Sequence, residues 1–361
     1  MDQKAIEVLF DWLVDGAPGT PNPVALLDKL LPALVAAGVG IERAEALVRT
    51  LHPHIAGRSF SWQRGGKVEV RENTWAYLNS PEFLETPVAR VFQAGEPIQT
   101  KGYAAFPFRF TNGEIHAITF STSSDFSNDE RAALARIVRP LARVAEIFAR
   151  ARTAANLLST YVGRDAGDRI LSGRIQRGDT ETIRCAIWFS DLRGFTSISQ
   201  SMDPGSIIRL LNHLFECQVP AIERHGGEVL KFMGDGLLGI FAIDEKRTER
   251  EACEAALRAF ADSTKALDAH NQKTNGDMRF GLALHLGEVA YGNIGGSSRL
   301  DFTCIGPAVN LASRIEGLTG KLGRPMLMSG AFAAALERAT HEVGAFEVKG
   351  VTEPQPVFEL E

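Results

Sequence analysis

The chain has 361 residues, of which 45% are hydrophobic, and its 39 Lys and Arg side chains stand against 44 Asp and Glu, a formal net charge of −5. At roughly 150 residues per domain, this length predicts two or three globular units, each able to bury its own core. The composition excludes collagen, long disordered tracts and coiled-coil rods. Because the charge balance is mildly acidic and Lys and Arg are not clustered, nucleic acid is not an expected partner.

The cysteines and the hydropathy indicate a soluble protein of the reducing cytoplasm. The four cysteines lie far apart and none belongs to a CxxC pair, so neither a zinc site nor a disulfide framework is predicted. The most apolar run near the N-terminus, residues 30–41, contains Pro32, Gly38 and Gly40. It is too short and too interrupted to span a membrane, and it does not follow the pattern of a signal peptide.

Residues 1–126 are expected to form an α+β domain, because helical stretches alternate with short strand patterns at residues 67–71 and 115–120. His52 and His54 are candidate metal or haem ligands, although a surface turn is the favoured interpretation. The aromatic residues of this region are candidates for lining a ligand pocket, but core packing is the expected role for most of them. They are Trp62, Trp75, Tyr77, Phe83, Phe106, Phe108 and Phe110.

A long helix is predicted to begin after Ser127, which forms a capping-box pattern with Glu130. Steps of three and four residues then give nine apolar positions, a pattern typical of a parallel two-stranded coiled coil. The alternative is an amphipathic helix packed on its own domain, bent at Pro140. We favour the coiled coil, and assign residues 127–183 to a signalling helix, coiled coil and linker. The nine positions are Leu134, Ile137, Leu141, Val144, Phe148, Ala151, Ala155, Leu158 and Val162.

Residues 184–361 form the last predicted domain, whose elements follow the order βαββαβ. Strands are predicted at residues 185–189, 229–233, 237–241 and 280–284, and helices at residues 206–224 and 251–270. This order is that of a ferredoxin-like α+β sheet. Because that fold has many functions, the order alone does not indicate one.

Two aspartates follow apolar strands of this domain. Asp191 ends the first strand, and Asp235 lies at the tip of the hairpin between Gly234 and Gly236. If the first strand and the hairpin are neighbours, both carboxylates lie at one end of the sheet. Two carboxylates with phosphate oxygens form the environment that Mg²⁺ or Mn²⁺ prefers. Taken singly, each aspartate is better explained by its preference for glycine-flanked turns.

A third segment, IGPAVNLASRIE at residues 305–316, places Asn310 and Arg314 on one face of a helix, where an amide and a guanidinium suit a ribose and a polyphosphate. Together with FSDLRGFT, LKFMGDG and FEVKG, in this order, it resembles the catalytic domain of the class III nucleotidyl cyclases. The resemblance extends from about residue 180 to the C-terminus.

The resemblance implies roles for individual residues. Asp191 and Asp235 match the aspartates that hold two Mg²⁺ or Mn²⁺ ions, with Leu192 in the same metal site. Asn310 matches the residue that orients the ribose, and Arg314 the residue that stabilises charge at the α-phosphate. The match also implies substrate contacts for Lys349, on the terminal phosphates, and for Phe195 and Thr196. Pro307 replaces a common acidic residue, which puts little in doubt.

The base-reading positions favour adenine. Adenine offers an acceptor at N1 and an amino donor, whereas guanine offers a protonated N1 and a carbonyl. The resemblance matches Lys231 to the lysine that reads adenine and Thr303 to the acceptor of its amino group. Cys304 is one position out of register with the cysteine of guanylyl cyclases. ATP is therefore the expected substrate, with a guanylate cyclase and a non-catalytic nucleotide-binding module as alternatives.

The resemblance also implies a homodimer, because in this family the aspartates and the base-reading, ribose and phosphate residues of one site come from different subunits. Residues 161–179 resemble the linker that precedes many bacterial domains of this kind. Residues 1–126 weakly resemble a GAF-type sensor, on residues 115–130. An input from a small molecule or a protein is therefore expected, and its identity does not follow from the sequence.

Overall fold

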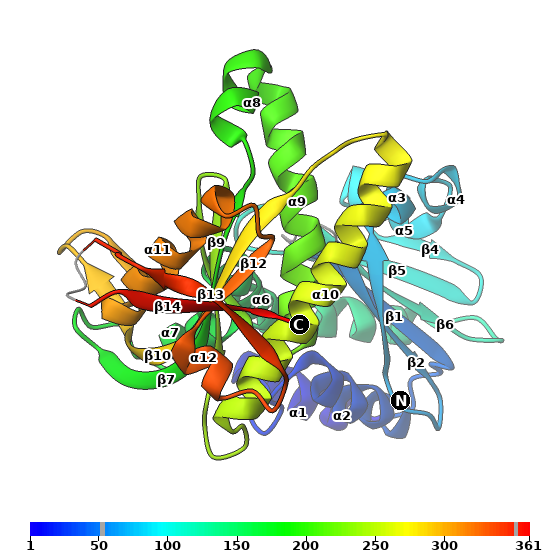
Figure 1. Cartoon of the computed structure of the whole chain (residues 1–361). Coiled ribbons are helices and arrows are strands. Elements are labelled where there is room, and N and C mark those ends of the chain that lie inside the picture. The colour runs from blue at the N-terminus through cyan, green and yellow to red at the C-terminus, as the bar shows by residue number, and fades with distance from the viewer. Residues whose placement is uncertain (51–54, 350–352) are drawn as a thin grey trace. The chain divides into compact units, whose positions relative to one another are not determined.

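The computed structural model describes residues 1–50, 55–349 and 353–361, which fall into two compact units, Met1–Leu157 and Leu158–Glu361 (Figure 1). His52, His54 and Gly350, the last residue of the FEVKG motif, lie outside the described residues. Within the described residues, every helix is too short or too polar to cross a lipid bilayer.

The first unit is built on a six-stranded antiparallel sheet with the strand order β3-β2-β1-β6-β5-β4. The strand expected at residues 115–120 is confirmed as β6, whereas the one expected at residues 67–71 begins two residues later, as β3. The strands are β1 (Arg43–Arg49), β2 (Ile55–Gln63), β3 (Glu69–Thr74), β4 (Ile98–Thr100), β5 (Tyr103–Arg109) and β6 (Ile115–Ser121).

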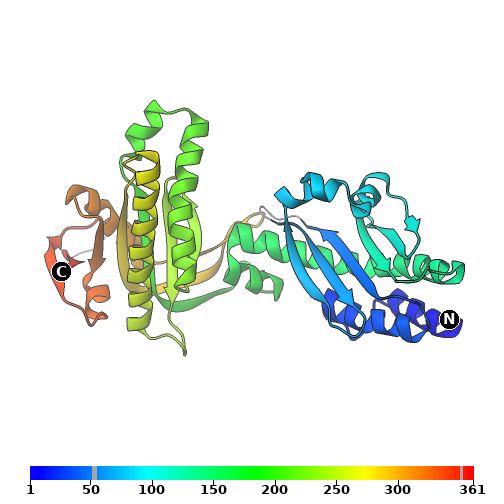
Figure 2. The same ribbon diagram turned by 90° about the vertical axis from the view of Figure 1, so that its right-hand side faces the viewer.

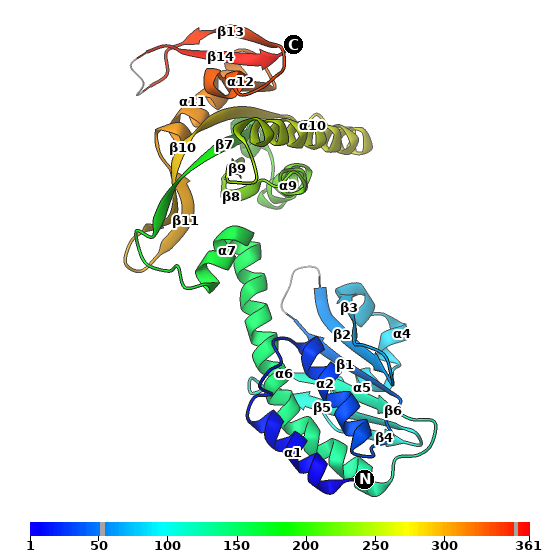
Figure 3. The ribbon, with the colours of Figure 1, turned by 90° about the horizontal axis from the view of Figure 1, so that it is seen from below.

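Helices cover both faces of this sheet. Alternate residues of a strand point to opposite faces, so Phe106 and Phe108 of β5 join the core under α1, α2 and α6, while Ala105 joins the core under α5. Figure 3 shows α1, α2 and α6 along one side of the sheet. Most of the aromatic residues singled out in the sequence are buried in these cores, as expected, but Trp75 is 39% exposed. The helices are α1 (Gln3–Val14), α2 (Pro23–Ala36), α3 (Trp75–Leu78), α4 (Pro81–Leu84), α5 (Pro87–Ala94) and α6 (Asn128–Val162).

Helix α6 begins with the predicted capping box. The backbone N–H of Ser127 donates to the Glu130 carboxylate at 2.8 Å, and the N–H of Glu130 donates to the Ser127 hydroxyl at 3.3 Å. The first four positions of the expected coiled-coil seam, residues 134, 137, 141 and 144, are buried in the core of the first unit. They are therefore not available to a second helix, and this half of α6 follows the alternative of a helix packed on its own domain. Over two heptads both arrangements give the same apolar pattern.

The second unit contains the expected βαββαβ order, with β7, β9, β8 and β10 in the spatial order β10-β7-β9-β8. Strands β12, β14 and β13 extend the sheet beyond β10, and β11 pairs with the other end of β10. The strands are β7 (Thr180–Leu192), β8 (Glu228–Met233), β9 (Gly236–Ala242), β10 (Phe280–Gly295), β11 (Leu300–Ile305), β12 (Met326–Ser329), β13 (Thr340–Phe346) and β14 (Gln355–Leu360).

Two long helices, α9 and α10, pack side by side on one face of this sheet (Figure 2). Trp188 of β7 points into the core beneath them, whereas Ile187 points to the opposite face, where Ala308 and Ala312 of α11 pack. The helices are α7 (Arg164–Leu171), α8 (Phe195–Ser201), α9 (Pro204–Arg224), α10 (Glu249–Thr274), α11 (Pro307–Lys321) and α12 (Gly330–Ala334).

The central strands β7 and β10 pair over their whole common length, from Leu192 opposite Phe280 to Thr180 opposite Gly292. Near the end where Thr180 lies opposite Gly292, the Tyr291 hydroxyl is 2.9 Å from the Asp165 carboxylate of α7 and 2.8 Å from the Glu228 carboxylate of β8. These hydrogen bonds fix α7 to the sheet.

Candidate active site

Asp191 lies at the end of β7 between two glycines on neighbouring strands, Gly236 of β9 and Gly281 of β10. A Cβ atom on Gly236 would lie 2.9 Å from the Ser190 carbonyl and 3.2 Å from the Asp191 carboxylate. Because real Cβ atoms do not approach backbone this closely, only glycine fits beside Asp191 in this geometry. Glycine at position 236 therefore lets the half-buried Asp191 carboxyl lie close against β9.

Asp235 is brought to the same place by the hairpin between β8 and β9. The turn has two residues, and of these only Gly234 has a positive φ, 69°, as in a type II′ turn. Burial raises the pKa of Asp191 to about 7, together with a hydrogen bond to the Asp235 carboxyl and the negative charges of Asp235 and Glu316. The two carboxyls therefore meet, as the order of the strands predicts.

Glu316 of α11 adds a third carboxyl beside this pair, and the sequence reasoning did not assign it a role. A Cβ atom on Gly281 would lie 2.6 Å from the Glu316 carboxylate, 2.5 Å from the Thr319 hydroxyl and 2.7 Å from the Arg193 guanidinium. Burial raises the pKa of Glu316, and the Arg193 charge partly opposes this. Arg193 is held in turn by the carbonyl of Arg324, 2.9 Å away. Glu316 ends the IGPAVNLASRIE motif, but its place beside Asp191 depends on how α11 packs on β10.

The donors at this position suit a hard divalent cation. Asp191 and Asp235 supply carboxylate oxygens, while the side chain of Leu192 is a hydrocarbon without a donor atom, so only its backbone carbonyl can contribute. Among the described residues, no group of three or more His, Cys, Asp or Glu could hold a metal by itself. Two carboxylates without further protein ligands match Mg²⁺, which keeps several waters and binds substrate phosphates. The residues present therefore fit the expected ions.

Lys231 of β8 and Asp301 of β11 form an ion pair, with Nζ 2.9 Å from the carboxylate. Its hydrogen bond and charge lower the pKa of Asp301. Thr303 lies two residues farther along β11, so it shares a strand face with Asp301, and it is buried. The predicted base-reading residues are therefore on neighbouring strands. The sequence does not predict the pairing of Asp301 with Lys231, because only the packing of β8 against β11 brings the two residues together.

Asn310 and Arg314 lie on an exposed face of α11, opposite the face that buries Ala308, Ala312 and Ile315. Within the described part of the chain, no hydrogen bond or ion pair joins either of them to Asp191, Asp235 or Lys231. The structure therefore groups the predicted residues into a carboxylate pair, a base-reading pair and a separate helix face.

The remaining predicted residues lie outside these three groups. Phe195 begins α8 and packs partly against the core, and Thr196 beside it is exposed. Lys349 is exposed in the turn after β13.

Residues 179–360 match the family described as the adenylate and guanylate cyclase catalytic domain. The chain belongs to this family. It is 37% identical over 163 residues to an adenylate cyclase of Anabaena cylindrica, a match that covers 43% of this chain and 31% of the relative. Adenylate cyclase 1 of Rhizobium meliloti (strain 1021) is 28% identical over 180 residues, or 48% of this chain and 26% of the relative. The chain thus spans about a third or less of these two proteins.

The fold of this cyclase-family chain is also similar to that of a bacterial light-regulated adenylyl cyclase of known structure. The TM-score is 0.52 at 19% sequence identity, and the match covers 70% of this chain and 83% of the other. At this identity the likeness concerns the fold alone. It agrees with the expected ferredoxin-like cyclase domain.

Proposed function

We propose that this protein is an adenylate cyclase, which converts ATP to 3′,5′-cyclic AMP and pyrophosphate. The observation that carries the proposal is the meeting of the Asp191 and Asp235 carboxyls at the end of the central strand, in a chain of the cyclase family. The relatives described above are named adenylate cyclases, which agrees with this choice of activity.

The reaction is an internal phosphoryl transfer. The ribose 3′-oxygen forms a bond to the α-phosphorus, the bond from that phosphorus to the bridging oxygen breaks, and pyrophosphate leaves while the 3′-hydroxyl proton is released. Asp191 and Asp235, with the Leu192 carbonyl, would hold two Mg²⁺ or Mn²⁺ ions. When bound, such ions lower the pKa of the 3′-hydroxyl and neutralise the triphosphate.

The residues on the face of α11 act on the sugar and the phosphates. Asn310 orients the ribose by its amide, and Arg314, a planar and permanently charged donor, stabilises the charge that develops at the α-phosphate. Lys349 binds the terminal phosphates as a point charge. Phe195 and Thr196 complete the substrate-binding segment beside the carboxylates. The exposure of Asn310 and Arg314 supports this assignment, because both side chains are free to reach a substrate.

Base recognition would use Lys231 and Thr303. The Lys231 ammonium donates to N1 of adenine, and the Thr303 hydroxyl accepts from the adenine amino group. The ion pair with Asp301 supports this role, because it holds the ammonium next to the strand that carries Thr303. Guanine, with a protonated N1 and a carbonyl, would meet a donor where it needs an acceptor.

The working enzyme would be a homodimer with two equivalent sites. The carboxylates of each site would come from one chain, and Lys231, Thr303, Asn310 and Arg314 from its partner. The separation of the α11 face from the carboxylate pair within one chain supports this division. Residues 1–126 would act as the sensor, and residues 127–183 would pass the signal, with the seam of α6 limited to the stretch after residue 144.

The direct test is turnover by the purified full chain with ATP and Mn²⁺, followed as release of cyclic AMP. Asp191→Ala and Asp235→Ala should each lower the rate about a hundredfold or more, because each removes a metal-binding carboxylate. Asp268→Ala, an exposed aspartate of α10 far along the sequence from the motifs, is the matched control and should not change it.

The outcomes separate the three functions. Equal turnover by the wild type and the two site variants would overturn the metal assignment. Faster turnover of GTP than of ATP, measured side by side, would identify a guanylate cyclase. Nucleotide binding without turnover of either would identify a non-catalytic module.

A further inference from the structure

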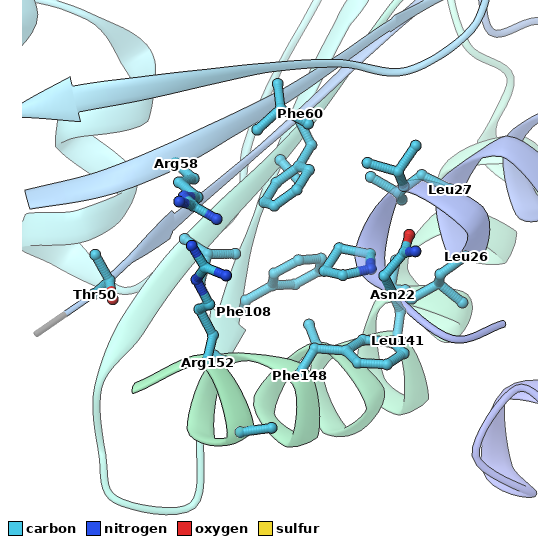
Figure 4. A pocket seen from close by; sticks show the side chains of 18 of the residues that line it. Asn22, Leu26, Leu27, Thr50, Arg58, Phe60, Phe108, Leu141, Phe148 and Arg152 are labelled. Atoms are coloured by element: carbon cyan, nitrogen blue, oxygen red, sulfur yellow. The ribbon is translucent and has the colours of Figure 1, made fainter. Parts of the chain in front are cut away.

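The first unit contains a cavity of about 630 Å³ between α2, the strands β1, β2, β3 and β5, and the middle of α6 (Figure 4). All of its described lining residues belong to this unit, from residue 21 to residue 152. The volume lies in the range of small-molecule sites, roughly 300–1,000 Å³. The family model does not extend to these residues, so the family gives the cavity no role.

Most of the wall is apolar. The rings of Phe60, Phe108 and Phe148 and the side chains of Leu27 and Leu141 project into the same space, as Figure 4 shows. An apolar ligand body would exclude water from these surfaces, at about 25 cal/mol for each Å² that it covers. The wall therefore selects a ligand with a substantial hydrocarbon part.

One end of the cavity is strongly cationic. Arg58 and Arg152 point their guanidinium groups into it from the side of Thr50, and Arg49 also lines it (Figure 4). No Asp or Glu is among the described lining residues. Arg58 pairs with Glu72, which lies outside the lining, whereas Arg49 and Arg152 form no ion pair with any described residue. The Thr50 hydroxyl oxygen is buried and has no hydrogen-bond partner among the described residues.

Arg49 and Arg152 are exposed and unpaired among the described residues, so an anion can reach their guanidinium groups, and the buried Thr50 hydroxyl would gain a partner from a polar ligand atom. A guanidinium binds a carboxylate through two parallel hydrogen bonds, and the apolar wall beside these arginines covers the hydrocarbon part of the same ligand. We propose that this cavity binds an amphipathic monocarboxylate. Its hydrocarbon tail lies against Phe60, Phe108 and Phe148, and its carboxylate lies between Arg58 and Arg152.

The ligand would contact the element that leaves the unit. The lining includes six residues of α6 between Leu141 and Arg152, and α6 continues to Val162, beyond the boundary of the first unit at Leu157. Occupancy of the cavity would therefore change the position or order of this helix. This regulatory part rests on the proposed function, whereas binding itself does not.

Binding is tested on the full chain by titration calorimetry with three probes. Dodecanoate, below its micelle concentration, has tail and charge, dodecan-1-ol has the same tail without charge, and butyrate has the charge without the tail. Dodecanoate should bind at one site per chain, dodecan-1-ol at least tenfold more weakly, and butyrate without measurable heat. Equal affinity for the acid and the alcohol would overturn the assignment of the arginines, and absence of dodecanoate binding would overturn the proposal.

Two variants locate the site. Arg152→Gln should weaken dodecanoate binding at least tenfold, while Arg139→Gln, an exposed arginine of the same helix that does not line the cavity, should not change it. Ala149→Trp should abolish binding by filling the space, with Arg139→Gln again as the reference for folding. Unchanged affinity in Arg152→Gln or Ala149→Trp would place the ligand elsewhere and overturn the proposal.

Cyclic AMP release with and without dodecanoate is measured on the same samples. Binding with a changed rate supports both the site and its regulatory part. Binding without any cyclase activity leaves the site standing and refutes the proposed function, whereas activity without binding refutes only the site. Binding that leaves an active enzyme unchanged refutes the regulatory part.

Discussion

Mixing two inactive variants should restore activity if each site is shared between two chains. Asp191→Ala removes a carboxylate at the end of β7, and Asn310→Ala removes the amide on the exposed face of α11. In a mixed dimer, one site receives both defects and the other receives neither. The first site is inactive and the second is intact, because its aspartates come from the Asn310→Ala chain and its asparagine from the Asp191→Ala chain.

The expected rate follows from counting sites. Random exchange of subunits at equal concentrations makes about half of the dimers mixed, and each mixed dimer has one working site of two. The mixture should therefore reach about one quarter of the wild-type rate of cyclic AMP release, while each variant alone stays near zero. The assay is turnover of ATP with Mn²⁺ after co-incubation long enough for subunits to exchange.

A matched mixture controls for trivial rescue. Asp191→Ala with Asp235→Ala should stay inactive, because both residues of either site come from one chain and every site keeps a defect. Rescue in this control would mean that the carboxylates are themselves shared between chains. No rescue in the Asp191→Ala and Asn310→Ala mixture, when mixed dimers are demonstrated by pull-down of differently tagged chains, would refute the composite site.

Three further predictions concern stability and specificity. Burial opposes ionisation of Glu146, but hydrogen bonds from Thr111 and Arg150 outweigh it and lower the pKa of this carboxyl from 4.5 to about 2. Glu146→Gln should thus cost up to about 3 kcal/mol in the free energy of unfolding at pH 7. Since a lowered pKa stabilises above the unfolded value, this cost should fade between pH 4.5 and 2, and a constant difference in melting temperature across that range would contradict it. Asp301→Asn should raise the KM for ATP by no more than about fivefold and leave kcat unchanged. The reason is that a half-exposed ion pair, here the one with Lys231, contributes about 0.2–1 kcal/mol. A loss of kcat alone would contradict the role of Asp301 in positioning Lys231. Tyr291→Phe should destabilise the second unit by about 1–3 kcal/mol in urea unfolding, because the partly buried Glu228 carboxyl loses its hydrogen bond to the hydroxyl and the exposed Asp165 of α7 loses its link to β10. An unchanged midpoint would contradict the anchoring of α7.

The sequence predicts the second unit well because its signals are local. The βαββαβ order follows from apolar runs separated by glycine turns, and the hairpin of Gly234 and Asp235 depends on a backbone conformation that glycine adopts at little cost. The meeting of Asp191 and Asp235 then follows from one assumption, that the first strand neighbours the hairpin. That assumption is correct, since β7 pairs with β9.

Other features depend on packing that no local pattern encodes. The pairing of Lys231 with Asp301 joins residues 70 positions apart, and Glu316 reaches Asp191 only because α11 lies over Gly281. The apolar repeat of α6 is ambiguous for a different reason. Over two heptads, a helix that packs on its own sheet and a helix that packs on a partner need the same apolar residues. Here Leu134 and Ile137 are buried in the core of the first unit.

The uninterrupted pairing of β7 with β10 has a mechanical consequence. Asp191 lies opposite Gly281 at one end of this two-stranded ribbon, and Tyr291, which holds α7, lies ten residue steps away at the other end, a separation of about 34 Å. The two strands keep one register without a bulge between these points, so the ladder of hydrogen bonds is continuous along the ribbon. If α7 tilted at Tyr291, the ribbon would carry that displacement to the carboxylates as one body, without a rearrangement of the strands in between.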